Sequence, residues 1–287
     1  MMGKSCDFVD LHMHSTFSDG TNSPAELLEF IMETNINTFS LTDHDTIDGN
    51  AVLEKIIKEK QYNINFIAGV ELGTFIKYKG KSYNTHILGY NIIDTNKELN
   101  DKLEFLRNQR STRFKKMVDK VNLLGYNIDF KNINNLSMKK SLGRPLLAEK
   151  LCSLGYFKNV QEVFNELLAE GKPGYVPQEK LSPAEAIRLI KESKGVAVLA
   201  HPAELKNDDL VKKILKEENF DGVEIWHPSA NEKKIKTYLE FANEYNLYVT
   251  GGSDFHGTKG RFPEKLGEFC VEYKKVSKFI NKLKSNN

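Results

Sequence analysis

The chain has 287 residues, of which 40% are hydrophobic and 28% are charged, and its net charge is +2. This is ordinary globular composition, and the length suits one large domain or two smaller ones. No apolar run approaches the roughly 20 residues of a membrane span or has the form of a leader, so we expect a cytoplasmic protein that does not associate with membranes. The three cysteines are scattered without a CxxC pair, which argues against a disulfide framework and against cysteine ligands for zinc.

Short apolar runs alternate with segments of helical period, a pattern typical of βα units around a parallel sheet. Strands are predicted at Phe8–Leu11, Thr38–Leu41, Asn65–Val70, Val196–Ala200, Gly222–Trp226, Leu247–Gly251 and Glu268–Val271, with Tyr83–Tyr90 paired to Thr74–Tyr78 across a Lys-Gly-Lys turn. Helices are predicted at Pro24–Thr34, Ala51–Lys60, Pro183–Lys191, Asp208–Glu217, Asn231–Glu244 and in the lysine-rich tail after Tyr273. The pattern indicates an α/β fold.

The middle of the chain has a different character, because its pattern is almost entirely helical. Helices are predicted at Leu99–Leu124, Pro145–Leu154 and Val160–Glu170. We therefore expect a barrel-like domain of residues 1–96 and 177–287, interrupted by a helical insertion of residues 97–176 that caps the substrate. Between positions 97 and 180 there are sixteen basic and ten acidic residues. This excess suits an anionic substrate, although a solvated charged insertion would explain the charge equally well.

The stretch from Asp10 to Gly20 carries the first chemical signal. His12 and His14 follow directly after a predicted strand, and residues two apart in extended chain point to the same side. Both imidazoles can therefore reach one point in space, as chelation of a metal requires. An isolated pair of this kind is more often one core histidine and one surface histidine.

The remaining histidines make the metal interpretation the economical one, because none of them falls on a predicted helix. His44, His201, His227 and His256 follow predicted strands, His86 lies within one, and the carboxylates Glu71 and Asp254 lie at strand ends. If the strands are parallel, these groups converge on the face that carries the chemistry in β/α barrels. About ten such side chains, at ~3–4 per open catalytic metal, predict two or three ions of manganese, iron or zinc. Sites of this kind activate water and bind phosphoryl oxygens, so we expect hydrolysis of a phosphoester.

These motifs, in this order, resemble those of the PHP (polymerase and histidinol phosphatase) metallophosphoesterases, over about residues 8 to 257. The resemblance implies a distorted (β/α)7 TIM-like barrel with a trinuclear site. It implies that His12, His14, Glu71 and Asp254 bind one ion, that Glu71, His86 and His201 bind a second with Glu71 bridging, and that Asp19, His44 and His256 bind a third.

Within this superfamily, the helical insertion and the phrases around Arg144 and Lys172 resemble a branch of small stand-alone enzymes. That resemblance implies phosphorylated substrates: a nucleoside 3′,5′-bisphosphate, a nucleoside monophosphate or a short 5′-phosphorylated RNA. The alternatives are a histidinol-phosphate phosphatase, a DNA exonuclease of the same superfamily, a regulatory metal-binding module without turnover, or a metal amidohydrolase. The modest basic excess and the lack of interleaved aromatic residues argue against stable binding of duplex nucleic acid. The oligomeric state is left open.

Several residues outside the ligand set are candidates for other roles. Asp45, His201 or His227 could give a proton to the leaving oxygen, and the sequence does not choose among them. Arg113, Arg144 and Lys172 are candidate phosphate contacts, with His227 as a further substrate contact, because basic side chains pair with phosphate oxygens. The competing interpretation of the two arginines and the lysine is a solvated charged surface.

Overall fold

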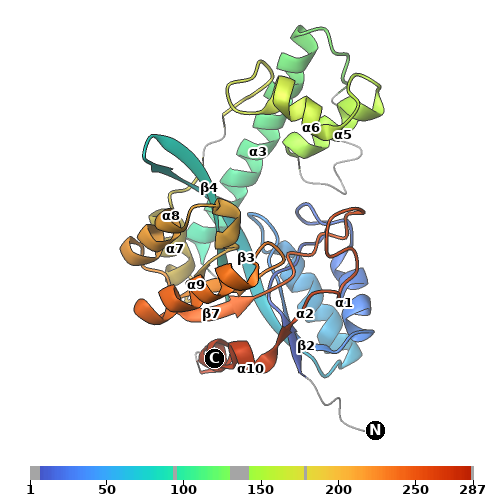
Figure 1. Cartoon of the computed structure of the whole chain (residues 1–287). Helices are drawn as coiled ribbons and strands as arrows, with labels where there is room; N and C mark the ends of the chain where they lie inside the picture. Colours follow the sequence, from blue (N-terminus) through green and yellow to red (C-terminus); the bar gives the residue numbers. More distant parts are fainter. Residues whose placement is uncertain (1–6, 93–95, 130–141, 178–179, 286–287) are drawn as a thin grey trace. The chain divides into compact units, whose positions relative to one another are not determined.

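The computed structural model describes residues 7–92, 96–129, 142–177 and 180–285, and these form two compact units (Figure 1). Unit 1 consists of residues 1–101 and 180–287, and unit 2 consists of residues 102–179. Among the described residues, no helix has both the length and the apolar character that crossing a membrane would require.

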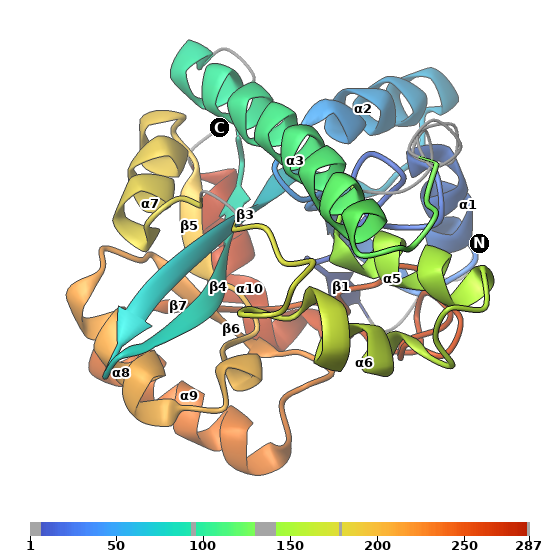
Figure 2. The ribbon, with the colours of Figure 1, turned by 90° about the horizontal axis from the view of Figure 1, so that it is seen from above.

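Unit 1 is built on one eight-stranded sheet in the order β7-β6-β5-β4-β3-β2-β1-β8. The long neighbouring strands β3 and β4 can be followed in Figure 2. Its strands are β1 (Phe8–Asp10), β2 (Ile36–Leu41), β3 (Asn65–Tyr78), β4 (Lys81–Tyr90), β5 (Val196–Leu199), β6 (Gly222–Trp226), β7 (Tyr248–Gly251) and β8 (Val271–Glu272). The Leu11 N–H donates to the Gly251 carbonyl at 3.2 Å, which brings the end of β7 against the end of β1 and nearly closes the sheet into a barrel. The prediction of a distorted TIM-like barrel with a helical insertion is confirmed.

Two of the strands run against the others. Pairing is parallel from β1 through β3 and from β5 through β7, whereas β4 is antiparallel to both of its neighbours. The predicted strands Asn65–Val70 and Thr74–Tyr78 are one continuous strand, β3, because every residue from Gly69 to Tyr78 pairs with β4. The predicted strand Glu268–Val271 is wrong in most of its length: only Val271 lies in β8, which pairs antiparallel with β1.

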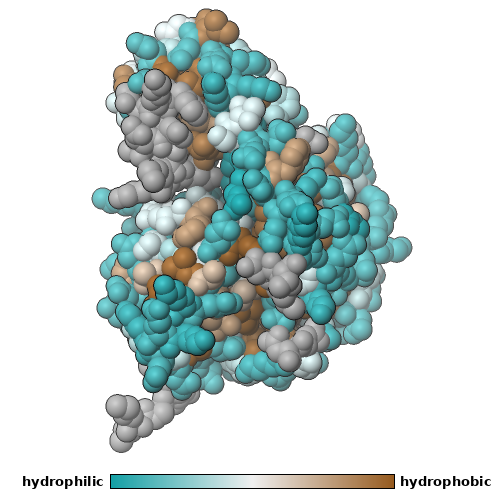
Figure 3. All heavy atoms as spheres, turned by 180° about the vertical axis from the view of Figure 1, so that it is seen from behind, coloured by the Kyte–Doolittle hydropathy of each residue, from teal (hydrophilic) through white to brown (hydrophobic). Residues whose placement is uncertain are grey.

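The helices of unit 1 are α1 (Pro24–Met32), α2 (Asp48–Lys60), α7 (Pro183–Glu192), a 3₁₀ turn η2 (Pro202–Leu205), α8 (Asp208–Glu217), α9 (Glu232–Glu244) and α10 (Tyr273–Lys284). The start of α1 is fixed by a capping box, in which Ser23 accepts from the Glu26 N–H while the Glu26 side chain accepts from the Ser23 N–H. Hydrophilic side chains cover most of the face in Figure 3, with hydrophobic residues gathered in smaller patches.

The core of unit 1 lies between the sheet and the helices that pack against it. One cluster joins Val9, Tyr90 and Val198 to Phe279 of α10, and a second packs α1 against Phe39 and Leu41 of β2. Tyr90 is fully buried, and its hydroxyl donates to the Leu11 carbonyl at 2.9 Å. This bond ties β4 to the first residue after β1, just before the histidine pair.

Unit 2 is helical. The helix α3 (Lys97–Leu123) enters it from unit 1, and α5 (Arg144–Ser153), α6 (Val160–Val163) and a π-helical turn, η1 (Phe164–Leu168), follow. Its core contains Phe114 and Met117 of α3 together with Leu147, Leu151 and Leu168. The predicted helix Val160–Glu170 is divided in the structure, because the backbone passes from α-helical to π-helical hydrogen bonding at Phe164.

Candidate metal centre

The ends of the barrel strands bring the predicted ligands to one place. His12 and His14 follow β1, and His44 follows β2, where it forms a β-bridge with Glu71 of β3. His86 lies on β4, His201 follows β5, and Asp254 and His256 follow β7. A second bridge, between Met13 and Phe255, joins the loop after β1 to the loop after β7. The antiparallel direction of β4 does not remove His86 from this end, because Gly73, two residues after Glu71, is its partner.

Two glycines permit the close approach of these loops. A Cβ atom on Gly20 would lie 2.2 Å from the His14 carbonyl oxygen, and one on Gly252 would lie 2.4 Å from the His12 Cβ. No larger residue fits at either position without moving a histidine backbone. Asp254 and His201 have positive φ angles of 51° and 25°, which are uncommon for residues with a side chain and cluster at functional sites.

The carboxylate of Glu71 is the centre of the cluster. Its two oxygens face five imidazoles: Oε2 lies 3.2 Å from His12 Nε2, 3.1 Å from His14 Nε2 and 3.2 Å from His44 Nδ1, and Oε1 lies 2.8 Å from His86 Nδ1 and 3.0 Å from His201 Nε2. The Glu71 side chain is almost completely buried. A single carboxylate shared by so many imidazoles is suited to bridge two cations.

Two further carboxylates flank this centre. Asp254 Oδ1 lies 3.3 Å from His12 Nε2 and 3.1 Å from His14 Nε2. On the other side, Asp19 Oδ1 lies 3.3 Å from His256 Nε2 and 3.7 Å from His14 Nδ1, while Asp19 Oδ2 lies 3.8 Å from the Nε2 atom of His44.

The donor set fits divalent cations. Ligands that share an ion at about 2.1 Å are themselves separated by roughly 3 Å, as the nitrogen and oxygen atoms around Glu71 are. His14 Nε2 is buried and has no hydrogen-bond partner among the described residues, although two carboxylate oxygens lie 3.1 Å away. The described residues form four groups whose ligand atoms lie within 4.8 Å of one another: His12–His14–Glu71–Asp254, His44–Glu71–His86, His14–Asp19–His44–His256 and Glu204–His227–Asp254. The cluster can hold metal ions.

Protonation in the metal-free cluster follows from these contacts. Burial alone would lower the pKa of His14, but the carboxylates of Asp254 and Glu71, each 3.1 Å from its Nε2, raise that pKa to about 10. Burial is outweighed in the same way at His201, where Glu71 raises the pKa to about 9. Burial would raise the pKa of Glu71, yet the surrounding histidines hold it well below its usual range. His44 differs, because burial lowers its pKa to about 3.

The sequence reasoning missed Glu224, a carboxylate of β6 that supports two of the predicted ligands. Glu224 is fully buried; its Oε1 lies 3.1 Å from His12 Nδ1, and its Oε2 accepts the His201 backbone N–H at 2.8 Å. A carboxylate on the far nitrogen of a ligating histidine fixes the ring and raises its basicity. The sequence does hold a signal for this residue: it is an acidic residue inside the apolar run Gly-Val-Glu-Ile-Trp, and a buried charge needs a partner.

A second supporting carboxylate, Asp43, accepts hydrogen bonds from the hydroxyls of Ser15 and Ser18, both at 2.6 Å. Ser18 Oγ lies 3.4 Å from His14 Nδ1, so Asp43 reaches that ring through the serine.

The three candidate proton donors have different surroundings. The Asp45 carboxylate accepts the Gly73 N–H at 3.3 Å and belongs to none of the four ligand groups found among the described residues. His201 Nε2 faces Glu71. His227 is 4% exposed, and its Nε2 has no hydrogen-bond partner within the described ranges; the nearest carboxylate oxygen is Asp254 Oδ2 at 3.6 Å.

The predicted phosphate contacts Arg113, Arg144 and Lys172 all lie in unit 2. The guanidinium groups of Arg113 and Arg144 face the same ring, that of Tyr175, at 6.0 Å and 5.8 Å from its centre. Arg113 also donates from Nε to the Val176 carbonyl, and burial together with the charge of Arg144 lowers its pKa to about 10. Lys172 is exposed.

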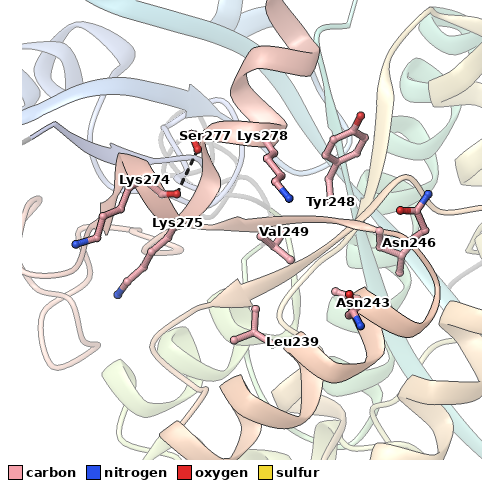
Figure 4. Close-up of a pocket in the computed structure, with 11 residues that line it drawn as sticks. Leu239, Asn243, Asn246, Tyr248, Val249, Lys274, Lys275, Ser277 and Lys278 are labelled. Atoms are coloured by element: carbon pink, nitrogen blue, oxygen red, sulfur yellow. Dashed lines mark hydrogen bonds between the residues drawn. The ribbon is translucent and has the colours of Figure 1, made fainter.

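A separate cavity of about 490 Å³ lies between α9, β7 and α10 (Figure 4). Leu239, Val249 and Asn243 line it together with lysines of α10, and the Lys278 ammonium points toward its centre in Figure 4. It contains none of the predicted site residues and offers no histidine or carboxylate ligand, so it is not the centre described above.

Comparison with known proteins gives a consistent result. Residues 10–250 match the model of the PHP domain family. The 5′-3′ exoribonuclease Rnm of Escherichia coli is 31% identical over 260 residues, which cover 86% of this chain and 84% of the relative. The 3′,5′-nucleoside bisphosphate phosphatase of Chromobacterium violaceum is 28% identical over 260 residues, covering 88% and 89%. A Bifidobacterium adolescentis protein assigned as a metal-dependent phosphoesterase has a crystal structure that superposes with a TM-score of 0.80 at 25% identity, covering 98% of both chains.

Proposed function

Because the chain belongs to the PHP domain family and is a metal-dependent phosphoric ester hydrolase, we propose that it hydrolyses the phosphate ester of a nucleotide or of a short 5′-phosphorylated RNA. The observation that carries this proposal is the cluster centred on Glu71, in which five imidazoles face one buried carboxylate. The relatives named above supply the substrate class.

The nine residues predicted as ligands would hold three ions of manganese, iron or zinc. The proposed sets are His12, His14, Glu71 and Asp254 for one ion, Glu71, His86 and His201 for a second, and Asp19, His44 and His256 for a third. The first set is supported by its ligand atoms lying within 4.8 Å of one another, and the second by the contacts of both histidines with Glu71 Oε1. In the third set, Asp19 is 38% exposed, so this position opens toward solvent.

Divalent ions in such a centre lower the pKa of bound water and polarise phosphoryl oxygens. The residues of the chain supply the rest of the mechanism. Glu71 and Asp254 compensate positive charge in a buried site, and Glu224 holds the His12 ring through its Nδ1 atom.

We propose that His227 donates a hydrogen bond to the phosphoryl group of the substrate. The Ser229 N–H donates to His227 Nδ1 at 3.1 Å, so a neutral His227 carries its proton on Nε2, the atom that lies beside Asp254. Asp45 is less suited, because its carboxylate is engaged by the Gly73 backbone.

Unit 2 supplies the proposed substrate cap. Arg113 and Arg144 place two guanidinium groups around one aromatic ring. Two like charges close together repel each other, so an anion between them is favoured. We propose that Arg113, Arg144 and Lys172 bind phosphate groups of the substrate.

Product analysis by chromatography tests the function. The manganese-loaded protein is offered adenosine 3′,5′-bisphosphate, AMP, histidinol phosphate and a short RNA with and without a 5′-phosphate. We expect conversion of the bisphosphate to AMP or stepwise release of nucleotides from the phosphorylated RNA, and loss of both after chelation. Turnover of histidinol phosphate alone would contradict the substrate class, and metal binding without any turnover would favour a regulatory module.

A further inference from the structure

Arg261 reaches the metal centre from the loop after β7. Its Nη2 donates to Asp254 Oδ2 at 2.5 Å, so this carboxylate has an imidazole-facing oxygen, Oδ1, and an arginine-facing oxygen, Oδ2. The loop is held by the Arg261 N–H bond to the Thr258 carbonyl and by the Gly260 N–H bond to the Glu264 carboxylate. All of these residues belong to unit 1, as the centre itself does.

The guanidinium retains most of its donor capacity. Arginine has five N–H donors, and the bond to Asp254 is the side-chain hydrogen bond that Arg261 makes within the described part of the chain. Its side chain is 46% exposed, whereas Asp254 is nearly buried. One edge of the guanidinium therefore contacts a predicted metal ligand, and the other edge faces solvent at the entrance to the centre.

His227 points at the same oxygen. Its Nε2 lies 3.6 Å from Asp254 Oδ2, it is buried, and no described group accepts its proton within hydrogen-bond distance. Because Ser229 fixes the proton on Nε2, two N–H donors from different loops converge beside Asp254. A non-bridging phosphate oxygen is, like the carboxylate oxygen beside which both donors lie, a small, negatively charged acceptor.

We propose that Arg261 is a phosphate-binding residue of this centre and that, with the Nε2–H of His227, it holds a non-bridging oxygen of a dianionic phosphate monoester. This inference rests on the proposed function, which it deepens. The open edge of the guanidinium takes the phosphate oxygen, and the first edge retains its bond to Asp254. The donors act on the phosphoryl group itself, so they serve every substrate that ends in a phosphate monoester, whichever nucleoside carries it.

The test measures the affinity of inorganic phosphate for the manganese-loaded protein by titration calorimetry, together with metal content. We expect Arg261→Met to weaken phosphate about 10- to 100-fold, the effect of losing a hydrogen bond between charged groups, and to leave the metal content unchanged. Arg261→Lys keeps the charge but loses the planar guanidinium, so its phosphate affinity should lie between those of the unmodified protein and Arg261→Met. Lys259→Met is the matched control: it removes the same charge from an exposed position of the same loop and should change the affinity less than twofold.

Two results would overturn the proposal: phosphate affinity of Arg261→Met within threefold of the unmodified protein, or loss of bound metal in that variant, which would make Arg261 a residue that positions Asp254. His227→Ala in both backgrounds adds a second criterion, because donors to one oxygen should give non-additive losses. Phosphate binding requires no turnover. If the protein hydrolyses nucleotides while Arg261→Met binds phosphate normally, only this proposal fails; if phosphate binds through Arg261 but no nucleotide is hydrolysed, only the proposed function fails.

Discussion

Replacing Glu224 by glutamine removes one buried charge and leaves the shape of the side chain almost unchanged. Glu224 lies 3.1 Å from His12 Nδ1 and accepts the His201 backbone N–H at 2.8 Å. A glutamine oxygen can keep one of these contacts, but its NH₂ group cannot accept the other. His12 then loses a charged partner on Nδ1, the nitrogen opposite the Nε2 atom that we propose binds metal, and the ring should become a weaker ligand.

Removing partners of this kind lowers metal affinity about 10- to 100-fold, or ~1.4–2.7 kcal/mol. We expect Glu224→Gln to lie in this range when manganese affinity is measured by competition with a chelator, and to recover most of its activity at saturating metal. Glu224→Asp keeps the charge but places it farther from His12, so this variant should lose less manganese affinity. Glu244→Gln, which alters a surface ion pair with Lys212, is the control. Unchanged affinity in Glu224→Gln would refute the role of this carboxylate, and so would equal losses in Glu224→Gln and the control.

Three further predictions test the centre and the cap. Glu71→Gln should bind less metal and lose about 1000-fold or more in turnover, measured by elemental analysis and rate, since it removes the carboxylate that we propose to bridge two ions; full metal content would contradict the bridge. In the metal-free protein the raised pKa values of His14, about 10, and His201, about 9, add stability that is complete below pH 6.5 and is lost as pH rises through 9 to 10. Its melting temperature should fall over this interval, and a flat profile would be evidence against these protonation states. Arg144→Met should raise KM for a nucleotide about tenfold with kcat unchanged; a fall in kcat alone would argue against a substrate contact.

The sequence predicted the barrel well because its strands are short, apolar and separated by clear helix signals. The predicted helices Pro24–Thr34 and Pro183–Lys191 begin at the same residues as α1 and α7, where Ser23 and Ser182 cap the helices. The convergence of the histidines was predictable for a related reason: all of them except His86, which lies on β4, stand just after a strand, and strand ends meet at one edge of a barrel. The sequence pattern was therefore enough to predict the features that depend on local residues and on the direction of the strands.

Other features depend on contacts that no local pattern records. Residues 71–73 were left between two predicted strands, yet β3 runs through them because every residue from Gly69 to Tyr78 pairs with β4. The partner of β8 is β1, more than 260 residues earlier in the chain. Arg261 lies seven residues after Asp254 in a loop without periodicity, and only the folded loop brings its guanidinium back to that carboxylate. Long-range pairing decided each of these cases.

The charges of the centre explain why its histidines and carboxylates occur together in the core. Isolated buried carboxylates would be costly, but Glu71 and Asp254 each face imidazoles that can carry a proton. In the metal-free protein, protons on His14 and His201 compensate that charge. A metal ion needs the same nitrogen atoms unprotonated, so protons and metal compete for one set of atoms, and metal affinity must rise with pH. The contacts that stabilise the protonated, metal-free cluster at neutral pH therefore weaken metal binding in acid. Glu224 contributes both to the stability of the metal-free cluster and to its affinity for metal.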